Sequence, residues 1–198
     1  MISLIGIVGG QGSGKTVVAR TFARYGYNYM PIGEPMDRMF SYFLSTHGVP
    51  GEVASRCITG DLRDTAQPAL GGKTVRESRR LMKQSWGEAQ GEAFWIEALK
   101  TRIADHDLTV TDDVESAAEA DAVRAMGGKL VLVTRPGITS IEVTPDFTYA
   151  NLGTLDDMEA WAADLAQSER GADYEDRMKA QEAALHNSPV LMRGRMRS

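Results

Sequence analysis

The sequence predicts an α/β fold in which a parallel β-sheet is covered by helices on both faces. Short apolar runs rich in β-branched residues, typical of strands buried on both sides, recur along the chain. Between them lie segments whose apolar residues are spaced three and four apart, as in amphipathic helices. Strands that alternate with helices form right-handed crossover units and a parallel sheet. The 198 residues fit one domain.

The amino-terminal segment predicts a strand, a glycine-rich loop and a helix, in that order. Residues 2–8 (ISLIGIV) form a nearly continuous apolar run. Val18, Phe22 and Tyr25 follow at helical spacing, which stops at Gly26. The loop between them, GGQGSGKT, satisfies the pattern G-x-x-x-x-G-K-[ST] in the strand-to-helix context that the motif requires. The sequence therefore predicts a P-loop NTPase fold.

A P-loop is a site for nucleotide phosphates. Its glycines let consecutive backbone N–H groups face one concavity, and the following helix adds the positive end of its dipole. Lys15 is placed to reach the β- and γ-phosphates, and the Thr16 hydroxyl is a candidate ligand of Mg²⁺. No N-K-x-D guanine-reading pattern is present, so we expect ATP and Mg²⁺ as cofactors. The predicted cofactor-binding residues of the loop are Gly9, Gln11, Gly12, Ser13, Gly14, Lys15 and Thr16.

The middle of the chain predicts two helices separated by a long loop. Residues 27–32 are compatible with a strand, which the proline among them would keep short or end. Residues 35–44 show apolar side chains at helical spacing after a proline. Residues 46–73 are rich in Gly, Pro, Asp and Thr and lack a period, which predicts a long loop or mobile insertion. Residues 74–77 (TVRE) have the form of a capping box and begin a helix that ends near residue 86.

The second half of the chain continues the alternation. The predicted elements are a helix over 92–105, a strand over 108–111, a capping box at 116–119 with a helix to Met126, strands over 130–133 and 147–150, and a helix over 155–165. Residues 170–198 predict a polar helical extension. We expect this extension to be solvated, with a contact to a partner or a second copy as the alternative.

Four cations project from one face of the helix that begins at Thr74. Arg76, Arg79, Arg80 and Lys83 fall at i, i+3, i+4 and i+7. In an acidic protein this stripe is a candidate substrate-binding clamp, because guanidinium groups bind phosphate oxygens in a bidentate fork. The alternative is a solvated basic face that pairs with nearby acids.

Two further candidate sites lie where predicted strands end, since open parallel sheets place their ligands there. Asp112 and Asp113 follow one strand. One carboxylate is expected to bind Mg²⁺, which we assign to Asp112, or to orient the acceptor; the alternative is an ordinary cap or turn acid. Arg135 follows the next strand and is expected to meet nucleotide, with a surface arginine as the alternative. The three histidines show no metal-ligand spacing.

Composition argues against several classes of function. A net charge of −5 disfavours stable nucleic-acid binding, for which a basic surface supplies most of the affinity. No apolar run approaches the ~18 residues of a membrane span, and no basic stretch precedes the first apolar run. Cys57 is the single cysteine and cannot form an internal disulfide, which suits a reducing compartment. We therefore expect a cytoplasmic protein with no membrane contact.

Together these motifs resemble the phage deoxynucleoside monophosphate kinase family over residues 1–166. Besides the P-loop, the segments that carry the resemblance are 72–74 (GKT), 80–87 (RLMKQSWG, family form R-x-x-x-Q-x-x-G), 94–96 (FWI), 113–114 (DV), 119–128 (EADAVRAMGG), 133–137 (VTRPG) and 151–155 (NLGTL). The resemblance implies transfer of the γ-phosphoryl group of ATP to a deoxynucleoside monophosphate. It also implies a five-stranded parallel core, with residues 34–91 as a mobile lid and substrate segment.

The resemblance further implies roles for individual residues. It places Arg80 and Gln84 in the substrate segment, Asp113 at the floor of the site, and Arg135 with Asn151 near ATP. The expected catalytic residues are Lys15, Arg80 and Asp113. The expected substrate-binding residues are Arg38, Arg76, Arg79, Arg80, Lys83 and Gln84. A kinase domain over 1–169 follows, in the host cytoplasm if the chain is phage-encoded, with a homodimer as one assembly that the sequence allows.

Two departures from the family pattern bear on the substrate. Where the family reads D-V-R-F-P, residues 113–117 read DVESA, so Glu115 replaces a phosphate-binding arginine. Either the basic stripe supplies the missing charge, or substrate choice has drifted, or activity is weak. Asp37 stands where the family often has a lysine, and the adjacent Arg38 is expected to serve instead. The alternative functions are a kinase of another small phosphorylated metabolite, resembling dephospho-coenzyme A kinases, and a nucleotide-binding regulatory protein that has lost transfer.

Overall fold

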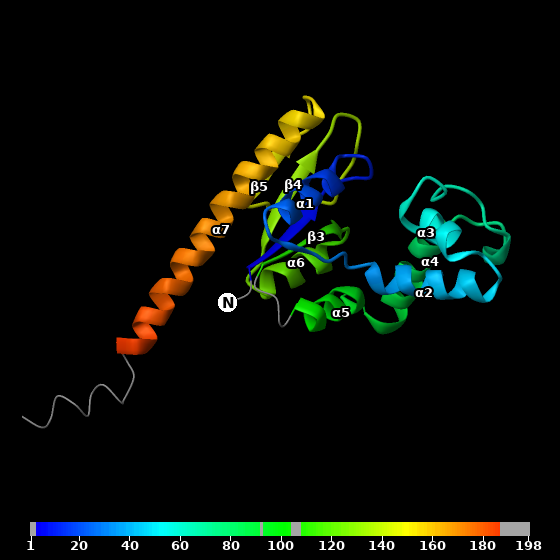
Figure 1. Ribbon diagram of the computed structural model, residues 1–198, viewed down its shortest axis with the longest axis horizontal. Helices are drawn as coiled ribbons and strands as arrows, with labels where there is room; N and C mark the ends of the chain where they lie inside the picture. The colour runs from blue at the N-terminus through cyan, green and yellow to red at the C-terminus, as the bar shows by residue number, and fades with distance from the viewer. Residues whose placement is uncertain (1–2, 92, 104–107, 187–198) are drawn as a thin grey trace, which may run out of the picture.

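The computed structural model describes residues 3–91, 93–103 and 108–186. Its centre is one parallel sheet of five strands, in the order β2-β3-β1-β4-β5 (Figure 1). The strands are β1 (Ser3–Val8), β2 (Asn28–Tyr29), β3 (Leu108–Val114), β4 (Lys129–Thr134) and β5 (Phe147–Ala150). β1 is central because its apolar run is buried on both faces. The predicted α/β fold with a five-stranded parallel sheet is confirmed.

Helices cover both faces of the sheet, and consecutive residues of β1 point to opposite faces. On one face Ile7 packs with Phe22 of α1 (Lys15–Arg24) and with α7 (Leu155–His186). On the other face Leu4 packs with Leu99 of α5 (Phe94–Ile103) and Val123 of α6 (Ala117–Ala125). The glycine loop between β1 and α1 therefore opens at the carboxyl edge of the sheet, where open α/β sheets bind ligands.

Three further helices form a group beside the sheet, on the side away from α7 (Figure 1). They are α2 (Glu34–Thr46), α3 (Gly51–Thr59) and α4 (Val75–Gln90), with a 3₁₀ turn at Pro68–Leu70. The prediction of a long loop over 46–73 is therefore wrong in part. Ala54, Cys57 and Ile58 of α3 are buried, and this short apolar face is stabilised by tertiary packing rather than by local propensity.

Both predicted capping boxes are confirmed. The Thr74 hydroxyl accepts a hydrogen bond from the Glu77 N–H at 3.1 Å, and the Glu77 carboxylate accepts one from the Thr74 N–H at 2.8 Å. Ser116 and Glu119 form the same reciprocal pair at the start of α6. Each box satisfies two N–H groups that a helix start leaves without an intrahelical partner.

Several boundaries differ from the prediction. Of the predicted strand 27–32 only β2 pairs, and β3 runs three residues further than 111, so that Asp112 and Asp113 lie within it. The last helix continues past residue 170 to His186, while residues 187–198 of the predicted extension lie outside the described residues, as do 92 and 104–105 of the predicted helix 92–105. Within the described residues, no helix combines the length and apolar character that a membrane span needs.

Candidate functional site

The P-loop turns so tightly that side chains would not fit at several of its positions. Gly14, the residue before α1, has φ of 111°, a left-handed conformation that favours glycine. A Cβ atom built on Gly10 would lie 2.2 Å from the Thr139 carbonyl oxygen, and one built on Gly14 would lie 2.5 Å from Met158 Cε. The glycines thus let the P-loop approach both the segment after β4 and α7. The resulting concavity at a helix N-terminus suits an anion.

Lys15 lies over this loop. Its Nζ donates hydrogen bonds to the carbonyl oxygens of Gly9 at 2.5 Å and Gly10 at 3.0 Å. Burial lowers the pKa of Lys15, while Glu115 and the two neighbouring aspartates oppose that shift. The ammonium group therefore lies against the loop carbonyls, and its contact with the terminal phosphates of ATP stays a prediction.

Thr16, Asp112 and Tyr29 form a connected group beside the loop. The Thr16 hydroxyl donates to Asp112 Oδ2 at 2.6 Å, and the Tyr29 hydroxyl donates to Asp112 Oδ1 at 2.8 Å. Burial and neighbouring Asp113 raise the pKa of Asp112. Burial raises the pKa of Tyr29 well above its usual range, and the nearby charge of Asp112 raises it further. The phenol therefore keeps its proton and acts as the donor.

This oxygen-rich group fits Mg²⁺, the ion that Thr16 and Asp112 are predicted to bind. Hydroxyl and carboxylate oxygens are the hard ligands that Mg²⁺ prefers, and Mg²⁺ commonly uses one or two protein oxygens together with substrate phosphates. Among the described residues, no three His, Cys, Asp or Glu side chains converge in a way that could hold a metal ion without other ligands. The two residues would therefore hold Mg²⁺ jointly with phosphate oxygens of ATP.

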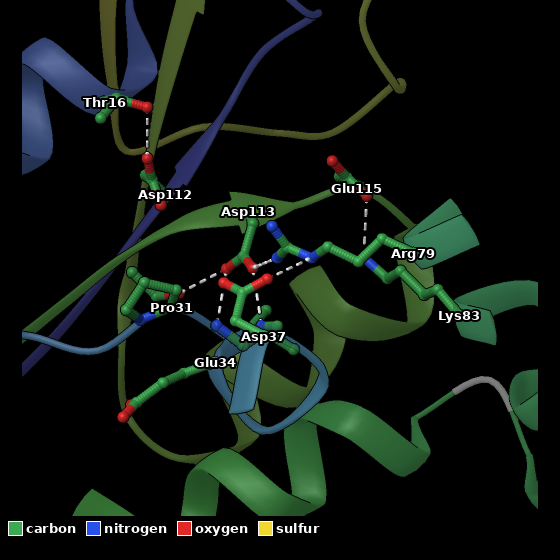
Figure 2. Close-up of polar contacts among 12 residues, drawn as sticks. Thr16, Pro31, Glu34, Asp37, Arg79, Lys83, Asp112, Asp113 and Glu115 are labelled. Carbon is green, nitrogen blue, oxygen red and sulfur yellow. Dashed lines mark hydrogen bonds and ion pairs between the residues drawn. The ribbon is translucent and has the colours of Figure 1, made fainter. Parts of the chain in front are cut away.

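Asp113 faces the opposite side of β3 and binds different partners (Figure 2). Its carboxylate accepts hydrogen bonds from the N–H groups of Ile32 and Gly33, each at 2.7 Å, and from the Thr111 hydroxyl at 2.9 Å. Arg79 Nη2 lies 3.5 Å from Asp113 Oδ2. Asp113 thus anchors the turn that leads into α2 and also contacts α4, while it lines the floor of the cavity described next.

One cavity of about 900 Å³ joins the P-loop to the helices beside the sheet. Seven cations line it, namely Lys15, Arg20, Arg63, Arg76, Arg79, Arg80 and Lys83. Four acids line it, namely Asp37, Asp112, Asp113 and Glu115. The four cations of the predicted stripe therefore lie in one cavity with the P-loop. Its formal excess of positive charge occurs in a chain whose net charge is −5.

Three cations of the stripe also pair with acids, as the alternative interpretation predicted. Arg76 pairs with Asp64 at 2.9 Å. Arg79 lies 3.3 Å from Asp37, whose own pKa is raised by burial despite that arginine. Lys83 contacts two carboxylates, at 3.0 Å for Glu115 and 2.9 Å for the buried Glu119. The cation stripe therefore both lines the cavity and pairs with acids, so the two interpretations describe the same surface of α4.

Three arginines of the cavity differ from the paired cations. Arg20, Arg63 and Arg80 form no ion pair within residues 3–91, 93–103 and 108–186. Arg63 is half-buried, and its pKa is lowered first by that burial and then by Arg76 and Arg79. A half-buried guanidinium close to two others and without a counterion is a candidate site for an anion.

Two predicted substrate residues do not line the cavity. Gln84 is exposed and donates to Glu88 at 2.9 Å, although it follows Arg80 by four residues and so shares a helix face with it. Arg38 pairs with Glu34 at 2.5 Å along the exposed face of α2. The structure therefore does not place Arg38 in the cavity where the missing lysine was expected.

Arg135 and Asn151 contact the P-loop from outside the cavity. Arg135 Nη1 donates to the Gly12 carbonyl at 3.1 Å, and Asn151 Nδ2 donates to the Ser13 carbonyl at 2.8 Å. Both residues thus hold the backbone of the P-loop, and their predicted place near ATP stays a prediction. The Ser13 hydroxyl is fully buried and has no hydrogen-bond partner among the described residues.

The sequence missed Arg20, Arg63 and Tyr29. Arg63 lies in the segment predicted as a loop, where no period shows which side chains point inward. Arg20 follows Thr16 by four residues and so shares its helix face, which is the signal that could have found it. Tyr29 depends on strand pairing, which local sequence does not reveal.

Several solved structures match this chain. The fold is similar to that of a cysteine-to-alanine mutant of the APS kinase CysC from Mycobacterium tuberculosis, with a TM-score of 0.42 and 14% identity. The match covers 84% of this chain and 97% of that chain. No family model matches the sequence, and no curated protein matches it.

Proposed function

We propose that this protein is a Mg²⁺-dependent kinase that transfers the γ-phosphoryl group of ATP to a deoxynucleoside monophosphate. The observation that supports it most is the cavity itself, which joins a P-loop to a wall of arginines. A P-loop alone indicates nucleotide binding. A second, cation-rich wall facing the P-loop indicates an acceptor that is itself anionic.

The size and charge of the cavity support a phosphorylated acceptor. Its volume of about 900 Å³ lies within the range of about 300–1,000 Å³ typical of small-molecule sites. Arg63 and Arg80 have no ion pair among the described residues, so both are free to bind the acceptor phosphate. The choice of a deoxynucleoside monophosphate rests on the resemblance of the motifs.

The catalytic roles follow from electrostatics rather than covalent chemistry. Phosphoryl transfer depends mainly on positioning and on neutralising the charge of the transferring group. Lys15 supplies a positive charge at the P-loop, and Arg80 supplies one from α4. Thr16 and Asp112 would hold Mg²⁺, which when bound neutralises phosphate charge. Closure of residues 34–91 over the cavity would exclude water.

Glu115 is compatible with this function because its charge is offset. Lys83 Nζ contacts both Glu115 and Glu119, so the acid that replaces the family arginine does not face the acceptor alone. The arginines that line the cavity outnumber the single arginine that Glu115 replaces. This supports the first of the three explanations for the departure, in which the basic stripe provides the missing charge.

The test is ADP formation that depends on an added acceptor. Purified protein is incubated with ATP and Mg²⁺ and with each deoxynucleoside monophosphate, with ribonucleoside monophosphates and with dephospho-coenzyme A. We expect at least one deoxynucleoside monophosphate to be converted to its diphosphate. Lys15→Ala should abolish turnover, and Arg80→Ala should chiefly weaken acceptor use.

Other outcomes would favour the alternatives. Stimulation by dephospho-coenzyme A alone would favour a metabolite kinase and contradict the proposal. Tight binding of ATP without acceptor-dependent ADP would favour a regulatory nucleotide-binding protein, for which the carboxylate of Glu115 in the cavity is the specific observation.

A further inference from the structure

Tyr29 is an aromatic residue of the edge strand β2 whose hydroxyl group reaches the P-loop site. We propose that Tyr29 is a positioning residue that fixes the Asp112 carboxylate for Mg²⁺·ATP. This inference deepens the proposed function and rests on its nucleotide half, because it concerns how the donor and its metal are held. It does not depend on which acceptor is used.

The register of the sheet places Tyr29 within reach of Asp112. Tyr29 pairs with Val110 on the neighbouring parallel strand β3. Side chains two residues apart on a strand share a face, so Val110 and Asp112 lie on the same side of β3. Thr16, at the start of α1, lies over that side as well, since its hydroxyl reaches Asp112. The long phenol therefore extends past Val110 to the carboxylate.

Two hydroxyl groups hold the carboxylate, one on each oxygen. Thr16 donates to Oδ2 at 2.6 Å and Tyr29 donates to Oδ1 at 2.8 Å. Asp112 is only 7% exposed and forms no ion pair within the described residues. The terminal torsion of aspartate is broad and roughly two-fold. Without the second donor, the carboxylate plane would be fixed by Thr16 alone.

The two hydroxyl donors come from different parts of the fold. Thr16 belongs to the P-loop and is itself a candidate Mg²⁺ ligand, so its hydrogen bond must adapt when a metal binds. Tyr29 comes from another strand, and its ring packs with the core beneath α1. It therefore holds one carboxylate oxygen independently of the loop. Partners of this kind orient metal ligands, and their loss typically costs 10- to 100-fold in metal affinity.

The test compares Tyr29→Phe with a matched control, Tyr42→Phe. The first variant removes one oxygen and retains the ring, while Tyr42 is 74% exposed on α2 and outside the cavity. Each protein is saturated with a non-hydrolysable ATP analogue, and bound Mn²⁺ is measured by electron paramagnetic resonance. We expect the Mn²⁺ dissociation constant to rise about 10-fold or more for Tyr29→Phe and to change less than about twofold for the control. Binding of the analogue in EDTA should be equal in all three proteins.

Two results would overturn the proposal. Unchanged Mn²⁺ affinity in Tyr29→Phe would show that the hydroxyl does not position Asp112. A loss of analogue binding in EDTA as large as the loss of Mn²⁺ affinity would assign the effect to folding of the loop.

The same design separates this inference from the proposed function. None of these measurements needs an acceptor or turnover. If no monophosphate stimulates ADP formation by the wild-type protein, the proposed function fails, and the Mn²⁺ titration still decides the role of Tyr29.

Discussion

Arg63 offers the sharpest test of how the cavity binds its acceptor. It is half-buried, lines the cavity, and forms no ion pair within the described residues. Truncation to alanine leaves no acid without a partner. The effect on stability should therefore be small, because the variant loses the repulsion from Arg76 and Arg79 together with the weaker attraction to Asp37 and Asp64.

The effect on the acceptor should be large. A hydrogen bond to a charged group contributes about 1.5–3 kcal/mol, and each 1.4 kcal/mol is about tenfold in an equilibrium constant. Arg63→Ala should therefore raise the KM for the monophosphate by about 10- to 100-fold. The KM for ATP should change less than about twofold, because Lys15 and the P-loop are untouched.

The assay measures initial rates of ADP formation at varied acceptor and at varied ATP. Arg56→Ala is the matched control, since Arg56 lies in the same segment, pairs with Asp61 at 2.7 Å and does not line the cavity. An acceptor KM for Arg63→Ala within twofold of the control would refute the reasoning. So would an equal increase in the KM for ATP, because Arg63 would then act on the whole site.

Three further predictions concern the core of the site. Burial raises the pKa of Asp112, so Asp112→Asn should raise the melting temperature of the ligand-free protein in thermal unfolding and weaken Mg²⁺·ATP binding in calorimetry; a lower melting temperature would contradict this. Burial by itself would lower the pKa of Lys83, but Glu119 and Glu115 raise it overall. The stability that Lys83 supplies is therefore present below pH ~10.5 and lost above it, so unfolding temperatures of wild type and Lys83→Met should converge at higher pH. Gly10→Ala places a Cβ 2.2 Å from a backbone oxygen and should abolish detectable ATP binding in calorimetry while far-ultraviolet circular dichroism stays unchanged.

Local sequence was sufficient where the physical cause is local. The P-loop needs glycines at tight turns, and the chain shows them between an apolar strand and a helix. The two capping boxes are contacts across three residues, which is why their residue types predict them. The cation stripe follows from helix periodicity, and Arg76, Arg79, Arg80 and Lys83 all line the cavity.

Sequence reasoning failed where the answer depends on long-range contacts. The helix α3 was missed because its short apolar face gains stability from packing with α2 and α4. Gln84 matched the family pattern and Arg38 was expected to replace a lysine of that pattern, yet neither side chain lines the cavity. A motif gives the order of residue types, and the rotation of a helix about its axis is decided by what it packs against.

The two adjacent aspartates show the division most clearly. The chain by itself determined that Asp112 and Asp113 meet the carboxyl edge of the sheet, because an apolar strand leads directly into them. Only the tertiary structure decided that Asp112 binds Thr16 and Tyr29 while Asp113 binds the turn before α2. Neighbouring side chains of a strand point to opposite faces. The partners on each face come from segments about 80 to 100 residues away along the chain.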